Sequence, residues 1–299
     1  MKKIIDRLLG KKTKPLPSPI DISTVPLDEE QLADALSHIQ HHEPQQLAHG
    51  CGQSVGKQRD HNEDYLFTFT VTIGGKGNNY PLGLFIIADG MGGHQYGEVA
   101  SSTAVRALAG YILKRFHSYI LDPSKGIEEP LQELMRAAIN EAQRAVTQSA
   151  PGSGTTLTVA LVLGQQMTIG HVGDSRAYSI RPDGRVETLT RDHSLVKRLE
   201  ELGQITSDEA ITHPQRNVLY RAVGQGDTLD ADIFTAPFPQ PGYLVLCSDG
   251  LWSVVNEDNL YKILKESSNL NHACQRMVTA ANDAGGPDNI SVIIIQLYG

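Results

Sequence analysis

Five aspartates lie where apolar, strand-like segments of this chain begin or end, and they are its strongest indication of chemistry. They are Asp64, Asp89, Asp174, Asp249 and Asp288. Aspartate is unfavourable inside a strand and costly to bury without a partner. Carboxylate oxygens are, however, the ligands that hard divalent cations prefer. Repeated placement of carboxylates at strand ends therefore predicts a metal-assisted hydrolase.

The segment 56–64 adds a cation to this set of anions. Arg59 carries a planar guanidinium suited to phosphate oxygens, and Glu63 and Asp64 follow shortly after it. A cation for phosphate beside carboxylates for metal is what phosphoryl hydrolysis requires. Taken alone, the segment is equally well explained as a charged, solvated turn.

Asp89 is followed by a glycine-rich segment, Gly90-Met91-Gly92-Gly93-His94. Glycine lets the backbone approach an ion, and the Gly90 carbonyl can itself be a ligand. A carboxylate that bridges two cations about 3.5–4 Å apart can place a hydroxide between them for in-line attack on phosphorus. The metals and Arg59 would neutralise the remaining phosphate oxygens, and no covalent phospho-enzyme is needed. A plain glycine turn is the alternative for this segment alone.

Hydrophobic patterning predicts strands joined by short turns and helices that come in pairs. Strands are expected at 65–73, 82–88, 155–163, 167–172, 177–180, 186–189, 243–247 and 290–297, and helices at 98–119, 130–146, 258–265 and 271–281. This order favours antiparallel sheets over a strand–helix alternation. We expect an α+β fold, a four-layer α-β-β-α sandwich in which two central antiparallel sheets are flanked by helix pairs.

Length and composition narrow the class of protein. The 299 residues are 40% hydrophobic, which is enough for one large domain or two small ones. A net charge of -8 disfavours a nucleic-acid partner. The three cysteines are an odd number with spacings unlike a zinc site, which indicates a reducing compartment. No apolar run approaches the roughly 20 residues that span a bilayer, and the N-terminus does not have the pattern of a signal peptide. We expect a cytoplasmic protein without a transmembrane anchor.

Residues 1–47 differ from the remainder and are predicted to be an N-terminal extension to a domain at 48–299. The first residues are basic, four prolines follow, and Asp28 could cap a short helix at 28–40. His38, His41 and His42 near its end are more easily explained as solvated side chains than as a metal site. The extension could touch an anionic membrane weakly or act as a flexible tail.

Seven motifs, in this order, resemble those of the metal-dependent protein phosphatases of type 2C in their compact bacterial form. They are Arg59-x-x-Asn62-Glu63-Asp64, Ala88-Asp89-Gly90-Met91-Gly92-Gly93-His94, Gly154-Thr155-Thr156, Gly173-Asp174-Ser175-Arg176, His213-Pro214-Gln215-Arg216-Asn217-Val218-Leu219, Ser248-Asp249-Gly250-Leu251 and Pro287-Asp288-Asn289-Ile290-Ser291. Each motif is weak alone, whereas all seven in the family's order are specific. The resemblance covers residues 50–297.

The resemblance implies an enzyme that hydrolyses phosphoserine and phosphothreonine in proteins with two Mn²⁺ or Mg²⁺ ions per active site. Asp89 would bridge the two metals, and Gly90 would give its carbonyl to one of them. Asp249 and Asp288 would complete the other. The attacking group would be the water or hydroxide that bridges the metals.

The same resemblance gives roles to residues at the edge of the site. Glu63 and Asp64 would act partly through water, and Arg59 would hold the substrate phosphate. Asp174 matches a position that contributes to a third, weaker metal. Many members support that metal with an aspartate where this chain has Ser253, so we expect the third metal to be weak or absent.

The general acid is the second departure from the family pattern. Animal members place histidine two positions after the bridging aspartate, where this chain has Met91. His94 lies nearby, as in bacterial relatives, and is the candidate catalytic acid. A solvent-linked water could equally protonate the leaving alkoxide.

The stretch 191–226 corresponds to the flap beside the active site in this family, with a helix expected from Val196 to Ile205. It would shape substrate choice or serve as a structural cap. His171, His193 and His213 are expected to be structural, and Trp252 to anchor the core.

Four functions are compatible with parts of this pattern. The favoured function is an active serine/threonine phosphatase that acts on phosphorylated proteins. Its expected partners are a serine/threonine kinase and the substrates of that kinase, and the expected state is a monomer. A pseudophosphatase should have lost metal carboxylates, and none of Asp89, Asp249 and Asp288 is lost. Phosphatases of anti-sigma-factor antagonists commonly lack the phosphate-binding arginine and the flap. A metal phosphodiesterase or nuclease would need a basic groove.

Overall fold

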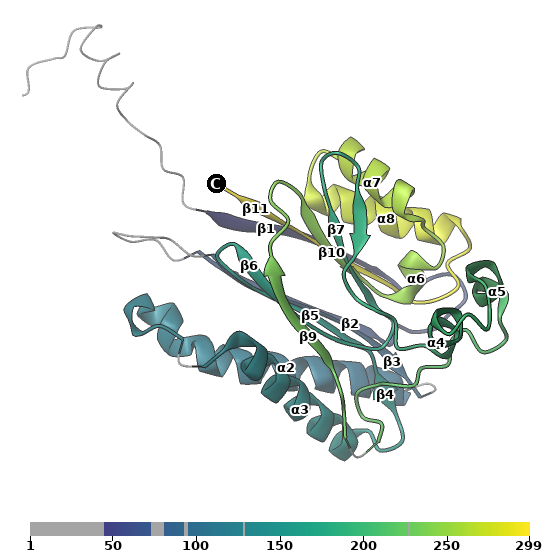
Figure 1. Cartoon of the computed structure of the whole chain (residues 1–299), viewed down its shortest axis with the longest axis horizontal. Helices are drawn as coiled ribbons and strands as arrows, with labels where there is room; N and C mark the ends of the chain where they lie inside the picture. Colours follow the sequence, from purple (N-terminus) through teal and green to yellow (C-terminus); the bar gives the residue numbers. More distant parts are fainter. Residues whose placement is uncertain (1–44, 73–80, 93–94, 128, 227) are drawn as a thin grey trace, which may run out of the picture. The chain divides into compact units, whose positions relative to one another are not determined.

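The computed structural model describes residues 45–72, 81–92, 95–127, 129–226 and 228–299. Within these ranges two antiparallel β-sheets pack face to face, and helices cover the outer face of each sheet (Figure 1). The expected α+β sandwich is therefore confirmed. Residues 1–44 of the predicted extension 1–47, with its predicted helix and histidines, lie outside the described residues, and residues 46 and 47 belong to strand β1 (Gln46–Ser54).

Two sheets form the centre of the domain. The first has the order β1-β11-β10-β7-β8 and the second the order β2-β3-β5-β6-β9, with β4 also paired to β3. The first comprises β1 (Gln46–Ser54), β11 (Ile290–Tyr298), β10 (Tyr243–Cys247), β7 (Arg176–Ile180) and β8 (Val186–Thr188). The second comprises β2 (Asp64–Val71), β3 (Leu82–Met91), β5 (Leu157–Leu163), β6 (Gln166–Val172), β9 (Asp232–Pro237) and β4 (Gly154–Thr155).

Side chains alternate between the two faces of each central strand, and this alternation creates three apolar layers. On β3, Phe85 and Ile87 enter the layer between the sheets, whereas Leu84 and Ile86 face the helices. The strands are buried on both faces, which explains their continuous apolar sequences.

The outer layers are helix pairs. Helices α2 (Gln95–Leu121) and α3 (Leu131–Ser149) cover the sheet that contains β3, and α7 (Glu257–Glu266) and α8 (Leu270–Asp283) cover the sheet that contains β11 (Figure 1). A short 3₁₀ helix, η1 (Pro123–Lys125), follows α2. None of the described helices has the length and hydropathy needed to cross a bilayer.

The flap carries α4 (Leu195–Glu201) and α5 (Ser207–Thr212) at one end of the sandwich (Figure 1). The predicted extension of the first flap helix to Ile205 is wrong, because Gly203 adopts a left-handed φ of 67° just after the last turn. Strand β1 was not predicted from the sequence. Its Gly50 and Gly52 interrupt the apolar pattern because they lie against the backbone and side chains of α8.

Candidate active site

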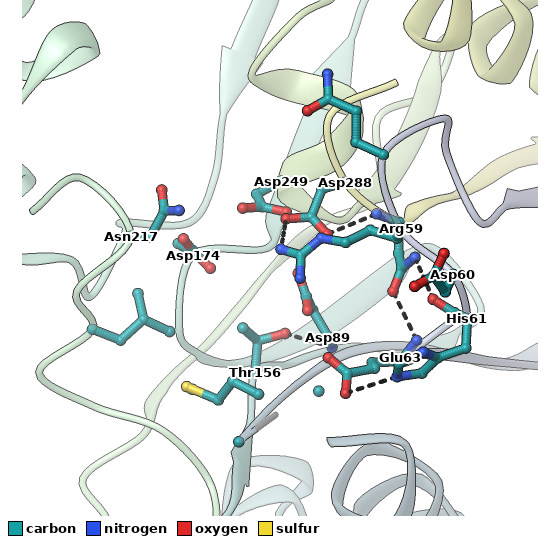
Figure 2. Close-up of a pocket in the computed structure, with 16 residues that line it drawn as sticks. Arg59, Asp60, His61, Glu63, Asp89, Thr156, Asp174, Asn217, Asp249 and Asp288 are labelled. Carbon is teal, nitrogen blue, oxygen red and sulfur yellow. Dashed lines mark hydrogen bonds and ion pairs between the residues drawn. The ribbon is translucent and has the colours of Figure 1, made fainter. Parts of the chain in front are cut away.

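A cavity of about 380 Å³ opens at one end of the sandwich, where segments from both sheets meet. Figure 2 shows that the aspartates face it from different segments, with Arg59 on one side and Asp174 and Asn217 on the other. The residues that line it are Gln58, Arg59, Asp60, His61, Glu63, Asp89, Gly90, Met91, Gly92, Thr156, Asp174, Asn217, Leu219, Asp249, Asp288 and Asn289.

Asp64 and Asp89 are direct neighbours across the β2–β3 pair. Asp64 is buried, and one carboxylate oxygen, Oδ2, accepts hydrogen bonds from the hydroxyls of Ser248 at 2.8 Å and Ser291 at 2.7 Å. Its other oxygen, Oδ1, is buried without a partner. Burial raises the pKa of Asp64 to about 7, with the two serine hydroxyls opposing the shift.

The backbone of Asp89 is fixed by Thr156, which lies between β4 and β5. Its N–H donates to the Thr156 hydroxyl at 2.9 Å, and the Thr156 N–H donates to its carbonyl at 2.8 Å. Removal from water raises the pKa of the Asp89 carboxyl well above its usual range, and the neighbouring carboxylates of Asp64 and Asp249 raise it further. The group is therefore held where a cation would be strongly favoured.

Asp249 is the first residue of α6 (Asp249–Trp252), directly after β10. Its Oδ1 atom is buried without a hydrogen-bond partner. Burial raises the pKa of Asp249 to about 6, and the nearby Asp288 carboxylate adds to this effect. Gly250 packs so closely on the chain that a Cβ there would lie 2.0 Å from the Asn289 carbonyl oxygen. The two metal-ligand candidates Asp249 and Asp288 are thus brought together by this contact.

Arg59 makes an ion pair with Asp288, with Nη2 and Oδ2 2.7 Å apart. The guanidinium is about half exposed at the mouth of the cavity. Asn289 joins this pair to the loop before β2: its side chain accepts from the Glu63 N–H at 2.7 Å and donates to the carbonyls of Val55 and His61 at 2.9 Å. The loop that carries Arg59 is therefore tied to the segment that carries Asp288.

Gly90 occupies a space that no other residue type could fill. A Cβ at this position would lie 2.1 Å from the Gly97 carbonyl oxygen and 2.8 Å from that of Glu63. The Gly90 N–H donates to the Glu63 carbonyl at 3.2 Å. The Glu63 carboxylate lies beside His61, with Oε1 3.3 Å from Nε2. The close approach of these backbones explains the glycine after Asp89.

Asp174 enters the cavity from the turn between β6 and β7 and is buried. Burial raises the pKa of its carboxyl well above the usual range, and the carboxylates of Asp249 and Asp192 act in the same direction. Ser253, in contrast, is exposed at the end of α6.

The donor set fits hard divalent cations, since it consists of carboxylate and carbonyl oxygens. The buried, unpartnered oxygens of Asp64 and Asp249 are those that a cation would satisfy. Yet no group of three or more His, Cys, Asp or Glu side chains among the described residues is arranged to hold a metal as it stands. The donors nevertheless have the chemistry that such cations select, because carboxylate and carbonyl oxygens from several segments face one cavity.

Comparison with known proteins identifies the family. The family model for protein phosphatase 2C matches residues 51–283. The chain belongs to the protein phosphatase 2C family. The expected family and enzyme class, a protein serine/threonine phosphatase, are confirmed.

The relatives agree in name and fold. A serine/threonine phosphatase stp of Listeria welshimeri is 36% identical over 247 residues, covering 81% of this chain and 92% of the relative. The serine/threonine phosphatase PstP/Ppp of Mycobacterium tuberculosis has a TM-score of 0.70 at 29% identity, covering 85% of this chain and 99% of that one. A catalytic domain of PstP in complex with two manganese ions has a TM-score of 0.68 at 28% identity, covering 85% and 99%.

Three of the four histidines considered in the sequence of the phosphatase domain have defined contacts in the structure. His94, the candidate acid, lies outside the described residues. The ring nitrogens of His171 contact the Thr158 hydroxyl and the Arg191 carbonyl, and burial lowers its pKa to about 4. His193 is buried and bonded to Gly173, and His213 ends α5 with its ring accepting from the Gln215 N–H. These contacts agree with the structural roles expected for the three.

Several residues of the phosphatase site had no predicted role in the sequence. Asn289, Ser248 and Ser291 position the carboxylates, and Asn217 and Leu219 bring the flap to the cavity. All five lie within the seven sequence motifs, so their positions could be found from the sequence. Only the pairing of distant strands shows which atoms they contact.

Proposed function

We propose that this phosphatase removes phosphate from phosphoserine and phosphothreonine residues of proteins. It would use two Mn²⁺ or Mg²⁺ ions held by its own strand-end aspartates. The observation that carries the proposal is the meeting of Asp89 and Asp249 at a cavity bordered by Arg59, with Asp64 directly behind Asp89 on the neighbouring strand. Asp64 and Asp249 each have a buried oxygen without a hydrogen-bond partner. The PstP domain of related fold was solved with two manganese ions, which supports the cofactor.

The proposed ligands keep the roles expected from the sequence. Asp89 would serve both ions, the Gly90 carbonyl would serve one of them, and Asp249 and Asp288 would complete the other. Glu63 and Asp64 would support the site from its edge. Bound at these residues, the cations would supply positive charge and lower the pKa of a water toward about 7.

Arg59 is the proposed phosphate ligand. Its guanidinium offers several donors in one plane, which match two oxygens of a phosphate. At present Asp288 takes one of these donors. Engagement of Asp288 elsewhere would release the guanidinium toward a substrate at the mouth of the cavity. The Arg59–Asp288 pair would then couple assembly of the site to phosphate binding.

The remaining roles are also proposals. Asp174 would contribute to a third, weak metal, which Ser253 does not support. His94 or water would protonate the leaving alkoxide. The flap would select among phosphoproteins through Asn217 and Leu219, which line the cavity.

We also propose a serine/threonine kinase and its substrates as partners, a monomeric state and a cytoplasmic location. The three free cysteines are consistent with a reducing compartment. Arg59 and the flap are both present, which counts against the phosphatases of anti-sigma-factor antagonists.

Phosphate release from a phosphothreonine peptide tests the proposed function. We expect release that requires Mn²⁺ or Mg²⁺, stops with EDTA and is lost in Asp89→Asn. Glu187→Gln on the exposed edge strand β8 is the control and should retain full activity. Binding of the phosphopeptide without turnover would indicate a pseudophosphatase, and activity in Asp89→Asn would overturn the mechanism.

A further inference from the structure

Trp252 connects two carboxylate-bearing segments that are far apart in the sequence. It is the last residue of α6, the helix that begins with Asp249. Its indole N–H donates a hydrogen bond to the backbone carbonyl of Asp174, with a nitrogen–oxygen distance of 2.9 Å. The sequence predicted only a core anchor at this position, whereas the side chain is half-buried and its polar end is used.

A second contact joins Trp252 to the same segment. The Arg176 guanidinium stacks on the indole, with Cζ 3.6 Å from the ring centroid. Arg176 is itself immobilised by two hydrogen bonds to the buried carboxylate of Asp192, at 3.0 and 2.7 Å. Stacking on a guanidinium whose donors are already engaged fixes the plane of both groups. Trp252 therefore meets the segment at residue 174 and again at residue 176.

The opposite side of this segment is held by the start of the flap. The N–H of His193 donates to the Gly173 carbonyl at 2.7 Å, and the Gly173 N–H donates to the His193 ring at 3.1 Å. These bonds place Gly173 but do not reach α6. Trp252 supplies the hydrogen bond and the cation–π contact that join this segment to α6, beside the β7–β10 pairing of Arg176 with Cys247.

We infer that Trp252 is a positioning residue that sets Asp174 against Asp249 and so controls how the site receives its cations. The inference rests on the proposed function for the identity of the ligand. The next residue, Ser253, is exposed and makes no such link to the Asp174 segment among the described residues. The indole hydrogen bond and the Arg176 stack therefore connect the helix that begins at Asp249 to the segment that carries Asp174.

The first test removes the indole N–H while keeping an aromatic side chain. In Trp252→Phe we expect faster amide hydrogen exchange at 173–176. We also expect the Mn²⁺ dissociation constant measured by calorimetry to rise about tenfold, as for other residues that orient metal ligands. Tyr261→Phe is the matched control, because it also removes an aromatic donor to a backbone carbonyl, that of Pro182 at 2.8 Å. It should change neither measurement.

A closer isostere guards against a general loss of packing. Trp252 is the only tryptophan in the chain, so 3-benzothienyl-alanine, which lacks the N–H, can replace it without affecting another site. The same two changes are expected with this analogue. Unchanged exchange at 173–176 and unchanged Mn²⁺ affinity in both variants would overturn the inference.

Coupling to Asp174 gives a second criterion. If Trp252 acts through Asp174, adding Trp252→Phe to Asp174→Asn should weaken Mn²⁺ binding no further. Additive losses would show that the tryptophan acts elsewhere. None of these measurements needs turnover, so a wild-type protein without phosphatase activity would refute the proposed function while the exchange data still decide the role of Trp252.

Discussion

The guanidinium of Arg59 and the carboxylate of Asp288 form an ion pair 2.7 Å across, which joins the proposed phosphate ligand to a proposed metal ligand. Both groups reach the cavity from loops that Asn289 ties together. A cation at Asp288 and a phosphate at Arg59 would each compete with this pair. The geometry therefore predicts opposite effects on the two ligands when Arg59 is removed.

Arg59→Ala should raise the KM for a phosphothreonine peptide about 10- to 100-fold, since a charged hydrogen bond contributes about 1.5–3 kcal/mol. Mn²⁺ affinity should not fall, because Asp288 loses a competitor. Steady-state kinetics at saturating Mn²⁺ and calorimetry measure the two quantities. Arg136→Ala, which breaks an exposed pair to Glu133 on α3, is the control. Weaker Mn²⁺ binding with an unchanged KM would contradict the assignment.

Asp64 should make the metal-free protein less stable as pH rises. Burial raises its pKa to about 7, so the folded state keeps a proton that the unfolded chain loses near pH 4. Stability is then lost as pH rises from about 4 to about 7. Relative to Asp64→Asn, whose side chain stays neutral, the wild-type Tm should fall across this window. Glu187→Gln should run parallel to wild type, and a constant difference between wild type and Asp64→Asn would refute the prediction.

Mn²⁺ should stabilise the folded protein through these carboxylates. A ligand at 100 times its Kd adds about 2.7 kcal/mol, which for a domain of this size corresponds to a Tm increase of roughly 5–11 °C. Thermal unfolding with and without Mn²⁺ measures the shift, and EDTA should reverse it. Asp249→Asn should lose most of the increase; a full increase in that variant would exclude Asp249 as a ligand.

Local patterns in the sequence were sufficient to locate the carboxylates. Asp89 and Asp249 follow buried apolar runs and precede glycine, and both signals are read within a few residues. The central strands were predicted for the same reason. Strand β9, Asp232–Pro237, was missed because it is a short, partly exposed edge strand without a clear alternation.

Contacts between distant segments could not be predicted in this way. Asn289 reaches Glu63, 226 residues earlier, only because β11 and the loop before β2 meet at one end of the sandwich. The Arg59–Asp288 pair and the hydrogen bond from Trp252 to Asp174 likewise depend on how distant strands and their loops are aligned in the folded domain. The residue types were visible in the motifs, but their partners were set by the tertiary fold.

Gly90→Ala should inactivate and destabilise the phosphatase. The new methyl would lie 2.1 Å from the Gly97 carbonyl oxygen, and relieving such overlap costs about 1–3 kcal/mol or more. Gly110→Ala on α2 is the matched control, because a Cβ there meets nothing within 4 Å. It should stabilise the protein by about 0.4–1 kcal/mol. Chemical denaturation and Mn²⁺-dependent activity give both readouts, and an active, stable Gly90→Ala would disprove the close approach.

Gln143 should influence protein substrates more than small ones. From α3 its side chain accepts from the Gly224 N–H at 2.6 Å and donates to the carbonyls of Gln225 at 3.3 Å and Gly226 at 3.1 Å. These bonds hold the C-terminal end of the flap, whose Asn217 and Leu219 line the cavity.

Gln143→Ala removes all three bonds without touching the carboxylates. We expect kcat/KM for a phosphothreonine protein to fall about three- to tenfold, because the flap is less well ordered. The effect is modest because water replaces the lost hydrogen-bond partners. For an aryl phosphate, kcat/KM should stay within twofold. Gln132→Ala, which removes a single bond to Thr235 from the same helix, should change neither rate. Equal losses on both substrates would assign Gln143 to the stability of the domain, and the flap would then be a structural cap.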